Sequence, residues 1–99
     1  MSARKHRYLI AYDIGSDHRR LRVAKTLQSY GYRLQYSIFQ VDASPVHIAR
    51  LVEKLDNEIE KQDDSVLVFD LGPAEEVSNT KIVRLGTSVD IRPNGPIVI

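Results

Sequence analysis

Asp13 is the strongest candidate for a functional residue in this sequence, because its carboxylate stands at the end of a segment with the composition of a buried strand. Residues 7–14 are rich in aromatic and β-branched side chains, and the turn residues Gly15 and Ser16 follow. A carboxylate in such a place needs a stabilising partner. Mg²⁺ typically binds one or two carboxylates and fills its other positions with water and phosphate oxygens. Asp13 is therefore our candidate metal ligand, and an Asx turn that closes the strand is the alternative.

Cations gather around Asp13 in the sequence. The first 33 residues carry eight Lys or Arg and two acids, whereas residues 34–80 carry three cations and ten acids. Because the net charge of the whole chain is only +1, this pattern predicts a localised phosphate-binding surface. Solvated helix faces are the alternative explanation. The candidate phosphate-binding residues are Arg19, Arg20, Arg22, Lys25 and Arg33.

The remaining polar residues form no recognised catalytic motif: there is no Gly-rich phosphate loop, nucleophile elbow or paired-histidine zinc motif. His18 is the only histidine close to Asp13 in sequence, and so the only nearby candidate for a general base. Asp63 and Asp64 are expected to close a turn. Asp70 is expected to face solvent at the end of its strand, and a place near a site is the alternative. Candidates either for stacking on bases or for packing at the rim of the core are Tyr30, Tyr32 and Tyr36.

Length and composition predict one small cytoplasmic domain. A chain of 99 residues is long enough for a single modest core. It contains no cysteine, which excludes disulfides and thiolate metal sites and is typical of the cytosol. No stretch approaches the ~20 apolar residues of a membrane span, and no signal peptide is visible. We expect residues 1–99 to form one domain with its core at about 7–71.

The order of the predicted elements indicates an α+β fold. Leu34, Tyr36 and Ile38 alternate with polar residues but Phe39 and Val41 fall on the other face, so the second extended segment should contain a kink, a bulge or two short strands. The expected elements are a strand at 7–14, a helix at 17–30, extended chain at 33–41, a helix starting at Ser44-Pro45, and a strand at 65–71 that Gly72-Pro73 breaks. This order predicts a ferredoxin-like βαββαβ sandwich, with two helices on one face of an antiparallel sheet.

The C-terminal residues 72–99 exceed what this core needs, and they predict a homodimer. Residues 74–80 are polar and loop-like, and residues 81–85 and 89–91 have the composition of short strands before an apolar tail. An extra strand of this kind is suited to edge pairing with a second copy or to docking on a partner. A two-fold axis would also bring two copies of Asp13 together, and two carboxylates make a usable site for a divalent cation where a single one is poor.

Three stretches in fixed order resemble the small CRISPR-associated proteins of the Cas2 type. They are the strand 8–14 that contains Asp13, the basic stretch 19–25, and the stretch 33–39 that reads Arg-Leu-Gln-Tyr-Ser-Ile-Phe after Gly31. The resemblance covers about residues 8–71, and residues 72–99 match only in general character. The combination of the three stretches is more specific than any one of them.

The resemblance implies a homodimer in which Asp13 of each protomer binds the metal, with Mg²⁺ as the cofactor and Mn²⁺ as a possible substitute. It implies cleavage of phosphodiester bonds in single-stranded RNA or in DNA. It also implies a partner, the CRISPR integrase of the Cas1 type, which would hold the central dimer during spacer acquisition in antiviral defence. By motif position, the supporting residues near Asp13 are Tyr12, Ser37 and Phe39.

Three functions stay open at this point. The first is a Mg²⁺-dependent endonuclease that acts with the integrase. The second is a non-catalytic dimeric scaffold that holds duplex DNA and bridges integrase dimers, in which Asp13 has no catalytic task. The third is a toxin-type ribonuclease, because the virulence-associated protein D family has the same fold.

Overall fold

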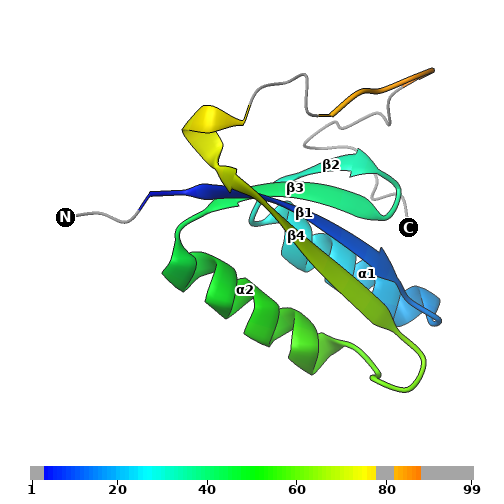
Figure 1. The fold of residues 1–99 in the computed structure, drawn as a ribbon. Coiled ribbons are helices and arrows are strands. Elements are labelled where there is room, and N and C mark those ends of the chain that lie inside the picture. Colours follow the sequence, from blue (N-terminus) through cyan, green and yellow to red (C-terminus); the bar gives the residue numbers. More distant parts are fainter. Residues whose placement is uncertain (1–3, 78–81, 88–99) are drawn as a thin grey trace.

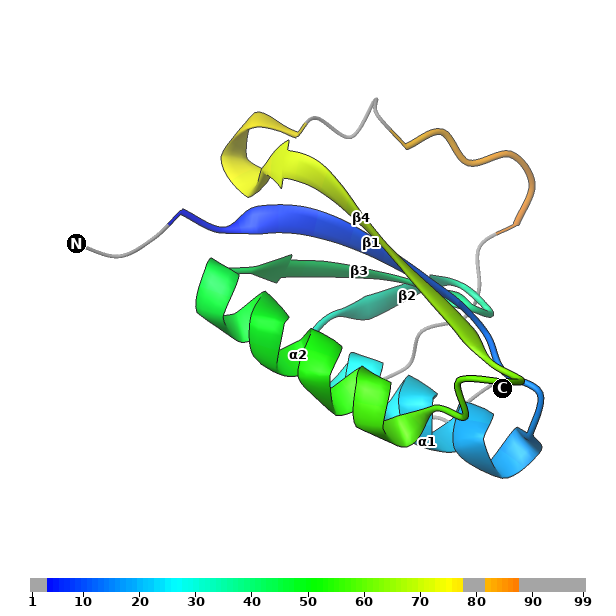
Figure 2. The same cartoon turned by 60° about the horizontal axis from the view of Figure 1, so that its bottom comes forward.

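The computed structural model describes residues 4–77 and 82–87, which form two layers. Four antiparallel strands in the order β2-β3-β1-β4 form the sheet, and both helices cover the same face of it (Figure 1, Figure 2). The elements are β1 (His6–Asp13), α1 (Asp17–Gln28), β2 (Tyr32–Gln35), β3 (Ile38–Ala43), α2 (Pro45–Glu58), β4 (Ser65–Pro73) and the 3-10 helix η1 (Ala74–Glu76). The predicted ferredoxin-like βαββαβ arrangement is confirmed.

Local capping signals start both helices where the sequence predicts. The Ser16 hydroxyl accepts a hydrogen bond from the backbone N–H of Arg19, which satisfies one of the free donors in the first turn of α1. Ser44 caps α2 in the same way, and Pro45 occupies the first helical position, where its missing N–H does no harm. α1 ends at Gln28, two residues before the predicted end.

The core lies between the helices and the face of the sheet that they cover. In β1 every second side chain points into it, so that Ile10 and Tyr12 are buried while Leu9 and Ala11 are only partly covered. Phe39 and Val41 of β3 have no exposed area. The face of the sheet without helices, called the outer face below, carries Leu9, Ala11 and, at the end of β1, Asp13.

The extended segment 33–41 consists of two strands, one of the forms that its pattern predicts. β2 and β3 are joined at Tyr36 and Ser37, and the register shifts between Arg33 and Gln35. Arg33 pairs with Phe39 across the two strands, and its guanidinium lies 5.0 Å from the centre of the Phe39 ring. Leu34 and Ile38 lie on the outer side of the sheet with Leu9, whereas Phe39 and Val41 are buried in the core, so the change of face that the pattern indicates falls between neighbouring residues of β3.

Three expectations for the chain after residue 71 differ from the structure. Gly72-Pro73 does not end β4: the strand continues to Pro73, which lies opposite His6, with a register shift between His6 and Tyr8. The edge position of β4 tolerates the proline, and Gly72 takes φ +101°, a conformation that favours glycine. Residues 74–76 form η1 instead of a loop, and residues 82–85 are in no strand of this single chain. Lys81, residues 89–91 and the apolar tail lie outside the described residues.

Candidate active site at the end of β1

Asp13 is the last residue of β1 and is exposed on the outer face of the sheet. Its cross-strand neighbour is Ser65, the first residue of β4. Within residues 4–77 and 82–87, no hydrogen bond or ion pair holds its carboxylate. The Asx turn is not formed, because the N–H of Gly15 donates to Asp64 instead. Asp13 thus presents its carboxylate to solvent at the end of a well-anchored strand.

Asp64 holds together the segments around Asp13. Its side chain is fully buried, at 0% exposure. It accepts hydrogen bonds from the N–H of Gly15 at 2.9 Å and the N–H of Glu60 at 2.8 Å. Arg19 adds a bidentate ion pair, from Nε at 2.7 Å and from Nη2 at 3.1 Å. One carboxylate therefore joins the turn after β1, the first turn of α1 and the loop before β4.

The ion pair and hydrogen bonds of this network shift the pKa values of both Asp64 and Arg19. The Arg19 guanidinium, with help from the two backbone N–H groups, holds the pKa of the Asp64 carboxyl far below its usual range. The hydrogen bonds that Arg19 donates to Asp64 in turn raise the pKa of Arg19. The expectation that Asp64 closes the turn is confirmed, but sequence reasoning missed its partner. Arg19, predicted to bind phosphate, is already engaged in this ion pair.

Arg20 stabilises the same turn from its other side. Its Nη1 donates to Oδ1 of Asp17 at 2.6 Å and its Nη2 donates to the carbonyl of Ile14 at 2.8 Å. Arg20 therefore bridges the end of β1 and the start of α1. Its side chain stays partly exposed, at 28%, so a phosphate can still approach it.

The other predicted cations fall into two groups. Arg22 and Lys25 are exposed on α1, and His18 is exposed one turn before Arg22 on the same side of the helix. Arg33 is buried, with 4% of its area exposed, and it stacks on Phe39 in the interior. Of these predicted phosphate-binding residues, Arg22 and Lys25 therefore offer the most accessible positive charge.

The predicted supporting residues lie around the end of β1 but differ in role. Phe39 is a core residue with no exposed area, and Ser37 is exposed in the β2–β3 turn. Tyr12 is buried, and its hydroxyl donates to the carbonyl of Tyr36 at 2.9 Å. Burial raises the pKa of the Tyr12 phenol, and the nearby charges of Arg33 and Arg20 oppose that rise. Tyr12 therefore acts as an anchor for the turn beside Asp13.

A divalent cation fits this site only in part. Within the described residues no group of three or more His, Cys, Asp or Glu side chains is placed to hold a metal ion. Asp13 nevertheless has the right chemistry, since its carboxylate is open to solvent and bound to no other group of those residues. A single protomer therefore offers one open carboxylate at the end of β1, and water and phosphate oxygens would have to fill the other positions of a cation there.

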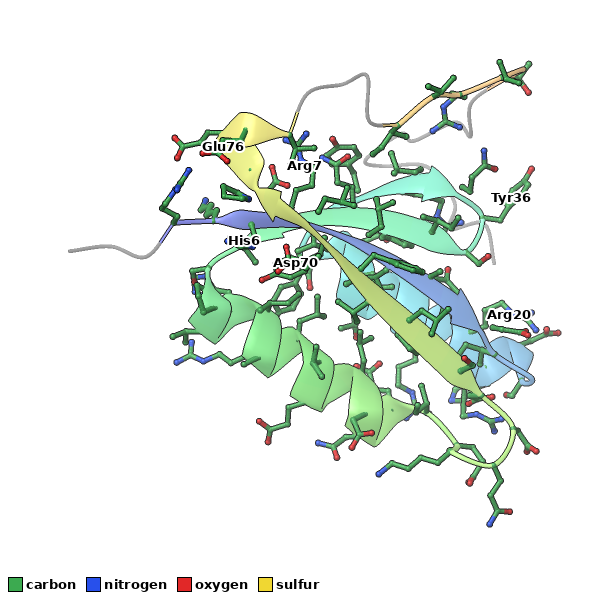
Figure 3. All side chains as sticks on the ribbon, in the orientation of Figure 1. His6, Arg7, Arg20, Tyr36, Asp70 and Glu76 are labelled. Atoms are coloured by element: carbon green, nitrogen blue, oxygen red, sulfur yellow. The ribbon has the colours of Figure 1, made fainter. Side chains whose placement is uncertain are left out.

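The opposite end of the sheet also carries charge, but the acids of β4 and η1 there are paired. Nδ1 of His6 lies 2.8 Å from Oδ1 of Asp70, and Gly72 donates its N–H to the same oxygen at 2.8 Å. These contacts lower the pKa of Asp70, the His6 hydrogen bond most of all. Figure 3 shows His6 and Asp70 facing each other, far from Arg20 and Tyr36. Both acidic residues of η1, Glu75 and Glu76, bind Arg4.

The outer face carries exposed apolar side chains next to Asp13. Leu67 is 55% exposed and Phe69 is 49% exposed on β4, and they pair with Ala11 and Leu9 of β1. Residues 82–85, in orange in Figure 1, lie over the β2–β3 side of this face, where Arg84 donates to the carbonyl of Leu34 at 2.7 Å. Among the described residues, none covers the β4 side of the face.

Comparison with known proteins identifies the family. A family model described as CRISPR associated protein Cas2 matches residues 6–78. The CRISPR-associated endoribonuclease Cas2 of Geobacter sulfurreducens is 34% identical over 86 residues, which are 87% of this chain and 90% of the relative. The chain belongs to the CRISPR-associated Cas2 family.

No helix of the described residues is long and apolar enough to cross a membrane.

Solved structures agree with this assignment. A crystal structure of Streptococcus pyogenes Cas2 at pH 6.5 superposes with a TM-score of 0.70 at 26% identity, and covers 81% of this chain and 99% of that one. A hypothetical protein from Thermus thermophilus gives a TM-score of 0.73 at 25% identity, over 89% of this chain and 99% of that one. The family resemblance noted in the sequence is confirmed.

Proposed function

We propose that this chain is a Mg²⁺-dependent endonuclease that cleaves phosphodiester bonds in RNA or DNA and acts with the CRISPR integrase in spacer acquisition. The observation that carries the proposal is the exposed carboxylate of Asp13, which is bound to nothing among the described residues although the backbone around it is tied down. The name of the relatives of this chain, CRISPR-associated endoribonuclease Cas2, supports a nuclease activity for it.

The proposed site needs two copies of the chain. A symmetric dimer packed through the outer face would cover Leu67 and Phe69 and bring the Asp13 side chains of both protomers toward one axis. The edge strand β4 also leaves backbone groups that a second chain can pair with. Light scattering at micromolar concentration should give about twice the mass of the chain. A monomer would contradict both the dimer and the shared metal site.

The residues of this chain have separate tasks in the proposed reaction. The Asp13 carboxylates of the two protomers would hold the cation, whose chemistry when bound is to polarise a phosphate and to lower the pKa of water. Asp64 and Arg20 hold the turn that follows Asp13, so that the backbone next to the carboxylate needs little reorganisation on binding. Arg22 and Lys25 supply exposed positive charge for the phosphate backbone. His18 stays the nearby candidate for a general base.

The decisive experiment compares wild type with Asp13→Asn. The substitution removes a ligand from both protomers, so we expect cleavage to fall on the order of 10²-fold or more. EDTA should abolish the wild-type activity, and Mg²⁺ or Mn²⁺ should restore it. Ser65→Ala, which changes the neighbour of Asp13 on β4, is the matched control and should keep most of the activity. Undiminished cleavage by Asp13→Asn would place the activity elsewhere.

A scaffold without catalysis is the second candidate, because Arg22 and Lys25 can bind phosphates without any help from Asp13. The two candidates differ in one assay, spacer integration by the integrase with Asp13→Ala in place of wild type. Integration that persists favours the scaffold. Integration that is lost, while dimerisation and DNA binding persist, favours a metal site that acquisition requires.

A further inference from the structure

Tyr36 is an exposed aromatic residue in the turn beside the end of β1. Its side chain is 58% exposed, and Figure 3 shows it projecting from the β2–β3 turn at the same end of the molecule as Arg20. The turn follows Gln35 and precedes Ile38, so Tyr36 belongs to neither strand. An aromatic face in this position can stack on a flat ligand.

Two hydrogen bonds connect the Tyr36 turn to the residue next to Asp13. The Tyr12 hydroxyl donates to the Tyr36 carbonyl at 2.9 Å, and the Tyr12 N–H donates to the Ser37 carbonyl at 3.0 Å. Tyr12 is 5% exposed, so the anchor of the turn is buried while the Tyr36 side chain is open to solvent. The backbone of the turn is thus held beside the end of β1, so a base that stacks on the ring does not have to order the turn first.

We infer that Tyr36 is a stacking platform for an unpaired nucleobase next to the bond that is cut, and that it selects single-stranded over duplex nucleic acid. This inference rests on the proposed nuclease function. A base inside a duplex is covered on both faces by its neighbours, whereas an unpaired base can turn onto a tyrosine ring. Stacking needs no base-specific hydrogen bonds, so the selection is by strandedness and hardly by sequence.

Tyr32 provides a matched control. It is also an exposed tyrosine, at 50%, but it lies at the start of β2, opposite Gln40 and away from the turn that Tyr12 anchors. A general affinity of exposed tyrosines for nucleic acid would involve both residues equally. A subsite beside Asp13 involves Tyr36 alone.

The test measures binding, so that it does not depend on cleavage. A single-stranded oligonucleotide with one 2-aminopurine, made as DNA and as RNA, is titrated in EDTA with wild type, Tyr36→Ala, Tyr36→Phe and Tyr32→Ala. We expect Tyr36→Ala to weaken single-strand binding on the order of tenfold and to remove the quenching that stacking causes. Tyr36→Phe, which keeps the ring, should behave like wild type, and duplex binding should not change.

Three results would overturn the inference. The first is an equal loss of single-strand affinity in Tyr36→Ala and Tyr32→Ala, and the second is an equal loss in Tyr36→Ala and Tyr36→Phe. The third is a Tyr36→Ala protein whose mass by light scattering differs from that of wild type, which would assign the ring to a subunit contact. If wild type stacks the probe but cleaves no strand with Mg²⁺, the proposed function fails while the binding subsite stands.

Discussion

Asp13 and Asp64 flank the same turn in the structure but are held in opposite ways. Asp64 is buried and accepts hydrogen bonds from Gly15, Arg19 and Glu60, so its carboxylate is fully engaged within the protein. Asp13 is exposed, and no group within the described residues binds it. A saturated carboxylate can only hold the fold together, whereas an open carboxylate can take a ligand. The contrast separates the residue that positions the site from the residue that is available for chemistry.

The largest effect on the fold should come from Asp64→Ala, because it leaves Arg19 and two backbone N–H groups without their acceptor. We expect the melting temperature to fall by more than about 5 °C, a substantial change for a domain of this size. The matched substitution Asp13→Ala should leave the melting temperature unchanged within about 2 °C, since this substitution removes no hydrogen bond or ion pair of the described residues. Equal decreases in the two variants, measured by circular dichroism, would erase the distinction between the two carboxylates.

A smaller effect should appear in the acid range. The pKa of Asp64 is lower in the folded state than in the unfolded chain, where it is about 4. Its contribution to stability is therefore complete above about pH 4 and is lost as the pH falls toward the folded value. Asp70, whose pKa is also lowered, acts in the same direction.

Thermal melts between about pH 7 and pH 3 measure this dependence. Asp64→Asn should be less stable than wild type at neutral pH and should lose less stability on acidification, so that the two curves converge. Asp70→Asn is the control for the other acid with a depressed pKa. Curves of wild type and Asp64→Asn that stay parallel over the whole range would show that Asp64 does not ionise differently in the two states.

The smallest effect should come from Arg22→Ala combined with Lys25→Ala, which leaves the turn around Asp13 untouched. Binding of duplex DNA should weaken, and the slope of log K against log salt should flatten by roughly one unit for each phosphate that the variant no longer neutralises. Arg50→Ala combined with Lys54→Ala removes the same charge from exposed positions on α2 and should change the slope less. Equal changes in both pairs would mean that net charge, and not the α1 surface, controls binding.

The sequence alone was enough for features whose cause is local. Ser16 and the Ser44-Pro45 pair start the helices through hydrogen bonds and backbone restrictions that span a few residues. The alternation in β1 identifies the strand and places Asp13 at its end. The pattern of residues 33–41 also indicated two short strands as one possibility, and the turn at Tyr36 and Ser37 separates β2 from β3.

Only the tertiary structure decided which charged residues are engaged. Arg19 and Asp64 are 45 residues apart and Gly15 and Asp64 are 49 apart, so no local pattern announces their contacts. Arg33 looks like a surface cation in the sequence, yet the pairing of β2 with β3 places it on Phe39 inside the protein. The sequence gives the number of cationic residues that lie close to Asp13 along the chain. Long-range packing determines that Arg19 is held by a buried carboxylate, because a buried charge must be satisfied by whatever the fold brings beside it.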